Sequence, residues 1–146
     1  QEMAKTLIVY ATRTGETEKI GNIIAEGIRI SGHEADVVKV TEIKNEKDMK
    51  GYDAVVFGSP TYHGEMVQGM KTLLFMAEKA DLEGKVGAAF GAFGWSGEAP
   101  DRIFETMKNI FKMNMVSIPL RLKSANLGGG LKMAQDYGRE IAEKLS

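Results

Sequence analysis

The chain has 146 residues, enough for one domain with a sizeable core, and its 43% hydrophobic and 27% charged residues are ordinary for a globular protein. The net charge of -1 gives nucleic-acid binding little support, and the absence of cysteine excludes disulfides, thiolate catalysis and cysteine-ligated metal sites. The two histidines, His33 and His63, lie far apart with no acidic metal cluster beside them. We therefore expect no metal site.

Segment 1–6 is polar and the apolar run that starts at Leu7 is short, so we expect no signal peptide. No apolar run approaches the length of a membrane span. We therefore expect a cytoplasmic protein that contacts neither membrane nor nucleic acid.

Strand-like apolar runs alternate with helical patterns along the chain. The strands are predicted at 6–10, 35–40, 54–57, 86–90 and 115–122, the second being the weakest. The amphipathic helices are predicted around 20–28, 67–77, 103–111 and 134–145, with at most a brief helix at 42–49. Repeated alternation of strand and helix predicts an α/β fold with a parallel sheet covered by helices on both faces.

Ligands of such sheets bind beyond the carboxyl ends of the strands, where the strand order reverses. Three loops follow strands and are therefore candidates for a site: 11–17, 58–64 and 91–98. The first loop contains Thr12, Thr14 and Thr17, and it leads into a helix. Hydroxyls beside the unpaired amides of a helix start form a phosphate site. A threonine-rich turn that only caps the helix is the alternative interpretation.

The loop lacks the Gly-Lys-Ser/Thr of a Walker A motif and the Gly-x-Gly-x-x-Gly of a dinucleotide fingerprint. Gly15 permits a positive φ, whereas Glu16 opposes a ligand of high negative charge. Arg13 either adds positive charge or points to solvent. These residues favour a single phosphate held mainly by neutral donors.

Each of the other two loops places an aromatic residue in a glycine-flanked turn, Tyr62 in GSPTYHG and Trp95 in GAFGWSGEA. Such a residue either stacks on a flat ligand or covers the end of the sheet. His63 either tunes a bound ring or is simply a solvated loop residue.

The motif from Thr12 to Thr17, Thr-Arg-Thr-Gly-Glu-Thr, resembles the Ser/Thr-x-Thr-Gly-x-Thr phosphate pattern of flavodoxins. The segments GSPTYHG and GAAFGAFGWSGEA are most similar to the flavodoxin domain of flavodiiron proteins. The resemblance covers essentially the whole chain and is to the short-chain group. It implies a single flavodoxin-like domain over residues 1–146. Its fold would be a three-layer sandwich with a five-stranded parallel sheet in the order 2-1-3-4-5 and helices on both faces.

The resemblance further implies one non-covalently bound FMN, no metal and no catalytic residue. The residues expected around its phosphate are Thr12, Arg13, Thr14, Gly15, Glu16 and Thr17. Those expected around its ring are Ser59, Pro60, Thr61, Tyr62, His63, Gly64, Ala92, Phe93, Gly94, Trp95, Ser96 and Gly97, with Trp95 stacked on one face. On reduction, the His63–Gly64 peptide is expected to rotate its carbonyl toward the flavin N5, with the Tyr62–His63 peptide as the alternative. Alanine at 64 is expected to disfavour the rotated state.

The implied function is that of a low-potential electron carrier that uses the semiquinone/hydroquinone couple of FMN. Its expected partners are a reductase or ferredoxin-linked oxidoreductase as donor and an electron-accepting enzyme, with the carrier itself a monomer. The alternatives are an FMN-dependent NAD(P)H or quinone reductase, or a domain excised from a flavodiiron enzyme. A signalling receiver is excluded, since the acidic residues that it needs after the first and third strands are absent.

Overall fold

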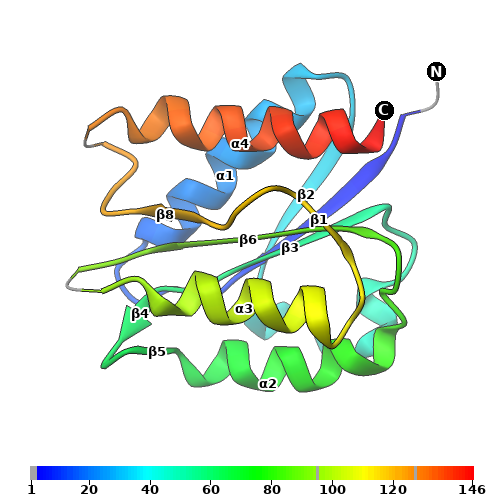
Figure 1. The fold of residues 1–146 in the computed structure, drawn as a ribbon, viewed down its shortest axis with the longest axis horizontal. Helices are drawn as coiled ribbons and strands as arrows, with labels where there is room; N and C mark the ends of the chain where they lie inside the picture. The colour runs from blue at the N-terminus through cyan, green and yellow to red at the C-terminus, as the bar shows by residue number, and fades with distance from the viewer. Residues whose placement is uncertain (1–2, 95, 127) are drawn as a thin grey trace.

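The computed structural model describes residues 3–94, 96–126 and 128–146 (Figure 1). Its main sheet is parallel and consists of β1 (Lys5–Tyr10), β2 (Glu34–Lys39), β3 (Ala54–Gly58), β6 (Val86–Ala92), β7 (Asn114–Met115) and β8 (Leu120–Leu122). The order is β2-β1-β3-β6, and both β7 and β8 pair with the outer edge of β6. The predicted order 2-1-3-4-5 is confirmed, with two short strands sharing the fifth position.

Helices cover both faces of this sheet, as predicted (Figure 1). Helices α1 (Glu16–Ile30) and α4 (Gly130–Leu145) lie together on one face, and α2 (Gln68–Ala77) and α3 (Glu98–Asn109) lie on the other. The described residues also form three short 3-10 helices: η1 (Val40–Glu42), η2 (Glu46–Met49) and η3 (Glu78–Ala80). Only η2 lies within the segment 42–49 in which a brief helix is predicted, since η1 ends at Glu42. None of the helices in the described ranges is both long and apolar enough to cross a membrane.

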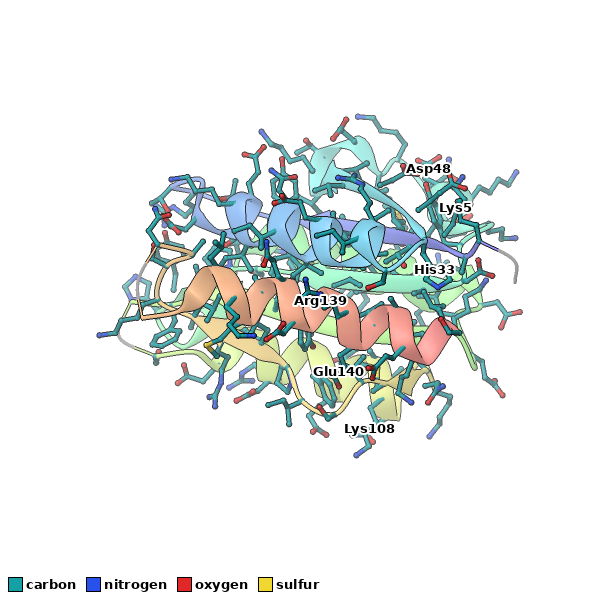
Figure 2. All side chains as sticks on the ribbon, turned by 90° about the horizontal axis from the view of Figure 1, so that it is seen from above. Lys5, His33, Asp48, Lys108, Arg139 and Glu140 are labelled. Carbon is teal, nitrogen blue, oxygen red and sulfur yellow. The ribbon has the colours of Figure 1, made fainter. Side chains whose placement is uncertain are left out.

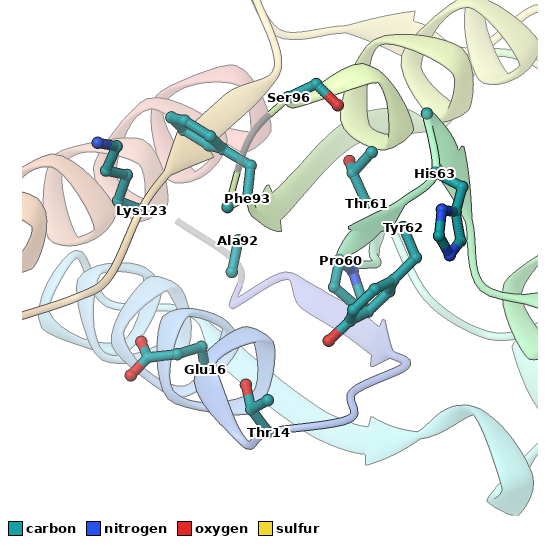
Figure 3. Close-up of a pocket in the computed structure, with 12 residues that line it drawn as sticks. Thr14, Glu16, Pro60, Thr61, Tyr62, His63, Ala92, Phe93, Ser96 and Lys123 are labelled. Carbon is teal, nitrogen blue, oxygen red and sulfur yellow. The ribbon is translucent and has the colours of Figure 1, made fainter.

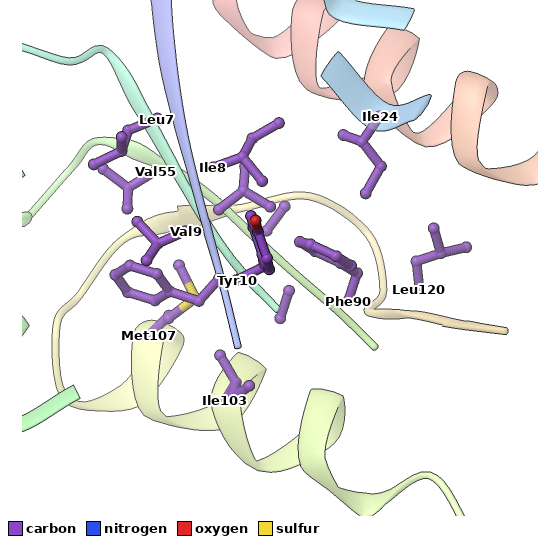
Figure 4. Close-up of a cluster of buried hydrophobic side chains, with 14 of the residues drawn as sticks. Leu7, Ile8, Val9, Tyr10, Ile24, Val55, Phe90, Ile103, Met107 and Leu120 are labelled. Atoms are coloured by element: carbon purple, nitrogen blue, oxygen red, sulfur yellow. The ribbon is translucent and has the colours of Figure 1, made fainter. Parts of the chain in front are cut away.

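The core lies where the middle strands meet the helices. Nearly every residue of β1, β3 and β6 is buried, which is why these strands read as continuous apolar runs in the sequence. Figure 4 shows Ile24 of α1 on one side of β1 and Ile103 and Met107 of α3 on the other. Figure 2 shows Lys108 and Arg139 on the outer sides of α3 and α4. The hydrophobic stripe of each helix thus faces the sheet.

The expectation of one continuous strand over 115–122 is wrong, because the segment leaves the sheet between β7 and β8. Pro119 lies in this interruption and has no N–H to donate to a strand ladder. The Tyr137 hydroxyl from α4 occupies the gap beside β6. It accepts a hydrogen bond from the Ala89 N–H at 3.3 Å and lies 3.0 Å from the Ala89 carbonyl oxygen and 2.8 Å from that of Ile118. One side chain therefore replaces the missing backbone partner.

A small feature that the sequence patterns do not predict follows β3. Strands β4 (Thr61–Tyr62) and β5 (Glu65–Met66) form an antiparallel hairpin separate from the main sheet. Strands of two residues are too short to produce a recognisable alternation of apolar and polar residues. This hairpin is placed at the carboxyl edge of the sheet, where it forms part of the site described next.

Candidate functional site

A cavity of about 470 Å³ opens at the carboxyl edge of the sheet (Figure 3). The residues that line it are Thr14, Glu16, Pro60, Thr61, Tyr62, His63, Gly64, Ala92, Phe93, Gly94, Ser96 and Lys123. They come from all three loops proposed from the sequence and from the segment that follows β8. Thr12, Arg13, Gly15, Thr17, Ser59 and Gly97 lie in the same loops without lining the cavity. Trp95 falls outside the described residues.

The first loop forms a tight turn into α1. The Gly15 N–H donates to the Thr12 hydroxyl oxygen at 2.9 Å, and Gly15 has a φ of 92°, in the left-handed region that glycine tolerates best. Thr12 therefore acts within the turn, in agreement with the capping interpretation for this one threonine. Thr14 is exposed at the cavity. Thr17 is buried, and its hydroxyl oxygen has no hydrogen-bond partner in the described structure.

Two oppositely charged side chains line the cavity at this end. Glu16 accepts a weak hydrogen bond from the Ala125 N–H at 3.4 Å and lies 3.7 Å from the Lys19 ammonium nitrogen. Both contacts partly offset the negative charge of Glu16, which by itself would disfavour an anionic ligand. Lys123 lines the cavity from the loop after β8, and sequence reasoning missed it. The rule that ligands bind at the carboxyl ends of strands applies to the fifth position as well, and applying it there would have identified this loop.

The β4–β5 hairpin turns through His63 and Gly64, whose φ values are 51° and 76°. A two-residue hairpin loop with positive φ at both central residues is a type I′ turn. The Ser59 hydroxyl donates to the Pro60 carbonyl at 2.9 Å and accepts from the Val67 N–H at 3.2 Å. The turn is therefore anchored at its base, and Ser59 serves the hairpin rather than facing the cavity.

A second anchor joins the hairpin to the third loop. The Thr61 hydroxyl accepts a hydrogen bond from the Ala99 N–H, near the start of α3, at 3.0 Å. Beside it, Glu98 has one carboxylate oxygen that is buried and without a partner in the described structure. The Ser96 hydroxyl lowers the pKa of Glu98 by hydrogen bonding to the carboxylate, and the backbone N–H of Glu98 itself adds to this effect. Glu98 thus stays ionised close to the cavity.

Two aromatic side chains flank the cavity, Tyr62 from the hairpin and Phe93 from the loop after β6 (Figure 3). Phe93 is held through its backbone N–H, which donates to the Leu122 carbonyl at 3.0 Å. The guanidinium carbon of Arg13 lies over the Tyr62 ring, 4.4 Å from the ring centroid. A cavity with two aromatic side chains and a few polar groups suits a flat ring that bears a polar substituent. Within the described ranges, no group of three or more potential metal ligands occurs.

Comparison with known proteins gives consistent results. The model of the family described as Flavodoxin matches residues 8–142. The type A flavoprotein fprA of Rhodobacter capsulatus is 30% identical over 149 residues, with 97% of this chain and 34% of that protein covered. This chain thus spans about a third of that relative's length. An NAD(P)H dehydrogenase (quinone) of Azorhizobium caulinodans is 30% identical over 142 residues, covering 81% and 71%. A solved flavodoxin from the domain Archaea aligns with a TM-score of 0.90 at 30% identity, covering 97% and 98%.

Proposed function

The chain belongs to the flavodoxin family, and from that premise we propose that it carries electrons by means of one non-covalently bound FMN. The observation that carries the proposal is the cavity at the carboxyl edge, which Thr14 and Glu16 line near the start of α1 and which Tyr62 and Phe93 flank. Its volume of about 470 Å³ lies within the roughly 300–1,000 Å³ usual for a site that holds one small ligand.

The donors around the first loop fit a phosphate. The buried Thr17 hydroxyl has no partner in the described structure, and leaving such a group unpaired costs about 1–3 kcal/mol. A phosphate oxygen beside the start of α1 would accept from this hydroxyl and from the first helix amides. Lys123 and the exposed Thr14 are further donors that line the cavity. The site thus selects a phosphate without a lysine in the loop itself.

FMN would supply the redox chemistry, and the residues of this chain would supply its placement and electrostatics. Tyr62 and Phe93 would exclude water from the two faces of the bound ring. The fixed hairpin sets the position of the His63–Gly64 turn at its edge. Glu98 holds negative charge nearby and disfavours the addition of electrons, whereas Lys123 opposes this effect. No side chain is assigned the role of acid, base or nucleophile.

We further propose that the protein is a carrier without a substrate-transforming site. Its partners would be a reductase or ferredoxin-linked oxidoreductase as donor and an electron-accepting enzyme, and the chain would act as a monomeric domain over residues 1–146. A quinone or NAD(P)H reductase is the second candidate, because one relative bears such a name. A domain of a longer flavodiiron-type protein is the third, because this chain spans only a third of the type A flavoprotein. Rapid NAD(P)H oxidation by the purified chain would favour the second.

The decisive experiment is to purify the protein, denature it and identify the flavin released. We expect a yellow protein that releases FMN and not FAD, and that rebinds FMN far more tightly than riboflavin. As the only tryptophan in the sequence, Trp95 provides an intrinsic reporter, and its fluorescence should be quenched when FMN binds. Equal affinity for FMN and riboflavin would contradict the phosphate assignment, and a colourless protein that binds neither would contradict the function.

A further inference from the structure

Arg13 and Tyr62 come from different loops, and the Arg13 guanidinium lies over the Tyr62 ring. The guanidinium carbon of Arg13 lies 4.4 Å from the centroid of the Tyr62 ring, within the range of a cation–π contact. Tyr62 is half-buried and lines the cavity, whereas Arg13 is exposed and does not line it. Arg13 therefore covers Tyr62 from outside the cavity.

We propose that Arg13 is a positioning residue that fixes Tyr62 as a wall of the cavity, and that it acts on the bound ring through Tyr62 rather than on the phosphate. The inference rests on the proposed function, since it takes the ligand to be a flavin. It separates Arg13 from Thr14 and Thr17 of the same loop, which serve the phosphate in the proposed function. It also means that the conformation of the first loop, which carries Arg13, affects the position of Tyr62 in the β4–β5 hairpin.

The chemistry of the two side chains supports this role. Tyr62 ends the two-residue strand β4 and is followed directly by the turn, so its side chain has little regular structure to hold it. A planar guanidinium stacks on an aromatic face and remains charged across the physiological pH range, which an ammonium group only partly reproduces. Holding the ring in one orientation before the ligand arrives lowers the entropy cost of binding.

The rival role for Arg13 is a direct contact with the phosphate, and two ligands distinguish the roles. FMN and riboflavin share the ring but differ in the phosphate. We expect Arg13→Gln to weaken both by the same factor, about two- to fivefold, which is the effect of losing an exposed cation–π contact. Arg13→Lys should give a smaller loss. Arg139→Gln on α4 removes the same charge away from the cavity and should change neither affinity.

A double-mutant cycle tests whether the effect passes through Tyr62. Tyr62→Leu should weaken both flavins, and Arg13→Gln should add no further loss in that background. Three outcomes would overturn the inference: a loss confined to FMN, an undiminished loss when Tyr62 is already leucine, or no loss at all.

A measurement without flavin separates this inference from the proposed function. In the apoprotein, the ring current of Tyr62 should shift the NMR signals of the Arg13 side-chain protons upfield, and Tyr62→Leu should abolish the shift. Unshifted signals would overturn the inference even if FMN binds normally. If the wild type binds neither flavin, the proposed function fails. Wild-type binding that Arg13→Gln leaves unchanged overturns only the role of Arg13.

Discussion

The polar groups at the two ends of the sheet differ in their hydrogen-bond partners. At the amino end, backbone donors meet side-chain acceptors: the Ala4 N–H donates to His33 Nδ1 and the Lys5 N–H to an Asp53 carboxylate oxygen, each at 2.9 Å. The Lys85 ammonium donates to the Tyr52 carbonyl at 2.6 Å. These contacts complete the hydrogen bonding of strand ends inside the chain itself.

At the carboxyl end, polar groups remain without partners around an open cavity. Of the three buried side-chain atoms without a partner in the described structure, two lie at this end, the Thr17 hydroxyl and one Glu98 carboxylate oxygen. The third, the Thr6 hydroxyl, lies in β1 near the amino end. Burying an unpaired polar group is unfavourable, and under the proposed function a ligand would supply partners at the carboxyl end. Substitutions at the amino end should therefore change folding, and those at the carboxyl end should change binding.

The largest effect is expected for Thr17→Val, which removes the unpartnered hydroxyl at nearly constant volume. FMN binding should weaken by about 1.5–3 kcal/mol, the range for a hydrogen bond to a charged group. The apoprotein should become more stable, because a buried hydroxyl without a partner is lost. Isothermal titration gives the affinity and urea unfolding of the apoprotein gives the stability.

Thr6→Val is the matched control. Thr6 is also buried with an unpartnered hydroxyl in the described structure, but it lies near the amino end of β1, whereas Thr17 lies in the first turn of α1 beside the cavity loop. This variant should also stabilise the apoprotein, while FMN affinity stays unchanged. If both valine variants behave alike toward FMN, the Thr17 hydroxyl has no role at the phosphate.

The sheet and its ligand edge could be predicted because their signals are local. Strands β1, β3 and β6 are buried on both faces and read as apolar runs, and the carboxyl-edge rule then indicates where ligands bind. The break between β7 and β8 could not be read from hydrophobicity, although Pro119 was a signal for it. The hydrogen bonds that Tyr137 forms at this break come from α4, which lies further along the chain.

Individual hydroxyls at the site were beyond prediction. The sequence places Thr12, Ser59 and Thr61 in ligand loops, but in the structure each hydroxyl oxygen accepts a backbone N–H. A hydroxyl that stabilises a turn and one that contacts a ligand look alike in sequence, because both favour the same loop positions. Only tertiary contacts distinguish Thr61, which accepts from Ala99, from Thr17, which has no described partner.

Tyr137→Phe tests the opposite case, a buried hydroxyl with partners. We expect the protein to lose about 2 kcal/mol of stability, since the N–H of Ala89 and nearby carbonyls lose their partner. FMN affinity should change little, because Tyr137 does not line the cavity. Urea unfolding at neutral pH measures the loss. A neutral effect would mean that water replaces the hydroxyl.

The same variant should alter the response to alkaline pH. Burial raises the pKa of Tyr137, whereas in the unfolded chain the phenol ionises near pH 10. Its contribution to stability is therefore complete below about pH 10 and is lost as the pH rises further. Unfolding free energies between pH 9 and 11 should decline less steeply for Tyr137→Phe than for the wild type. An identical decline would contradict the assignment.

A smaller loss is expected for His33→Leu at the amino end. The ring is buried, its Nδ1 accepts from the Ala4 N–H, and its Nε2 lies 3.1 Å from the Ser146 hydroxyl (Figure 2). Losing these contacts should cost about 1–1.5 kcal/mol of stability and leave FMN affinity unchanged. The other histidine, His63, is exposed, so His63→Gln should scarcely change stability. If the two variants lose equal stability, the hydrogen bonds of His33 are not the cause of its loss.

The smallest effect compares two glycines at opposite ends of the sheet. Gly51, just before β3, has a φ of 88°, and Gly64 has a φ of 76°. Alanine at either position keeps a positive φ and should cost about 1 kcal/mol of stability. Open space surrounds Gly51, and the nearest atom to a Cβ at Gly64 would be a Glu98 carboxylate oxygen at 3.9 Å, so no clash adds to the strain.

Only Gly64→Ala should also change the reduction of bound FMN. If reduction rotates the His63–Gly64 peptide, the type I′ turn becomes type II′, in which φ is positive only at the first central residue. Alanine at 64 is then strained before the rotation and relaxed after it. The substitution should therefore favour the rotated state, whereas the sequence analysis expects it to disfavour that state. The first reduction potential should therefore rise by up to about 40 mV, the equivalent of about 1 kcal/mol for one electron. Gly51→Ala should leave the potential unchanged, and an unchanged potential in Gly64→Ala would mean that this peptide does not rotate.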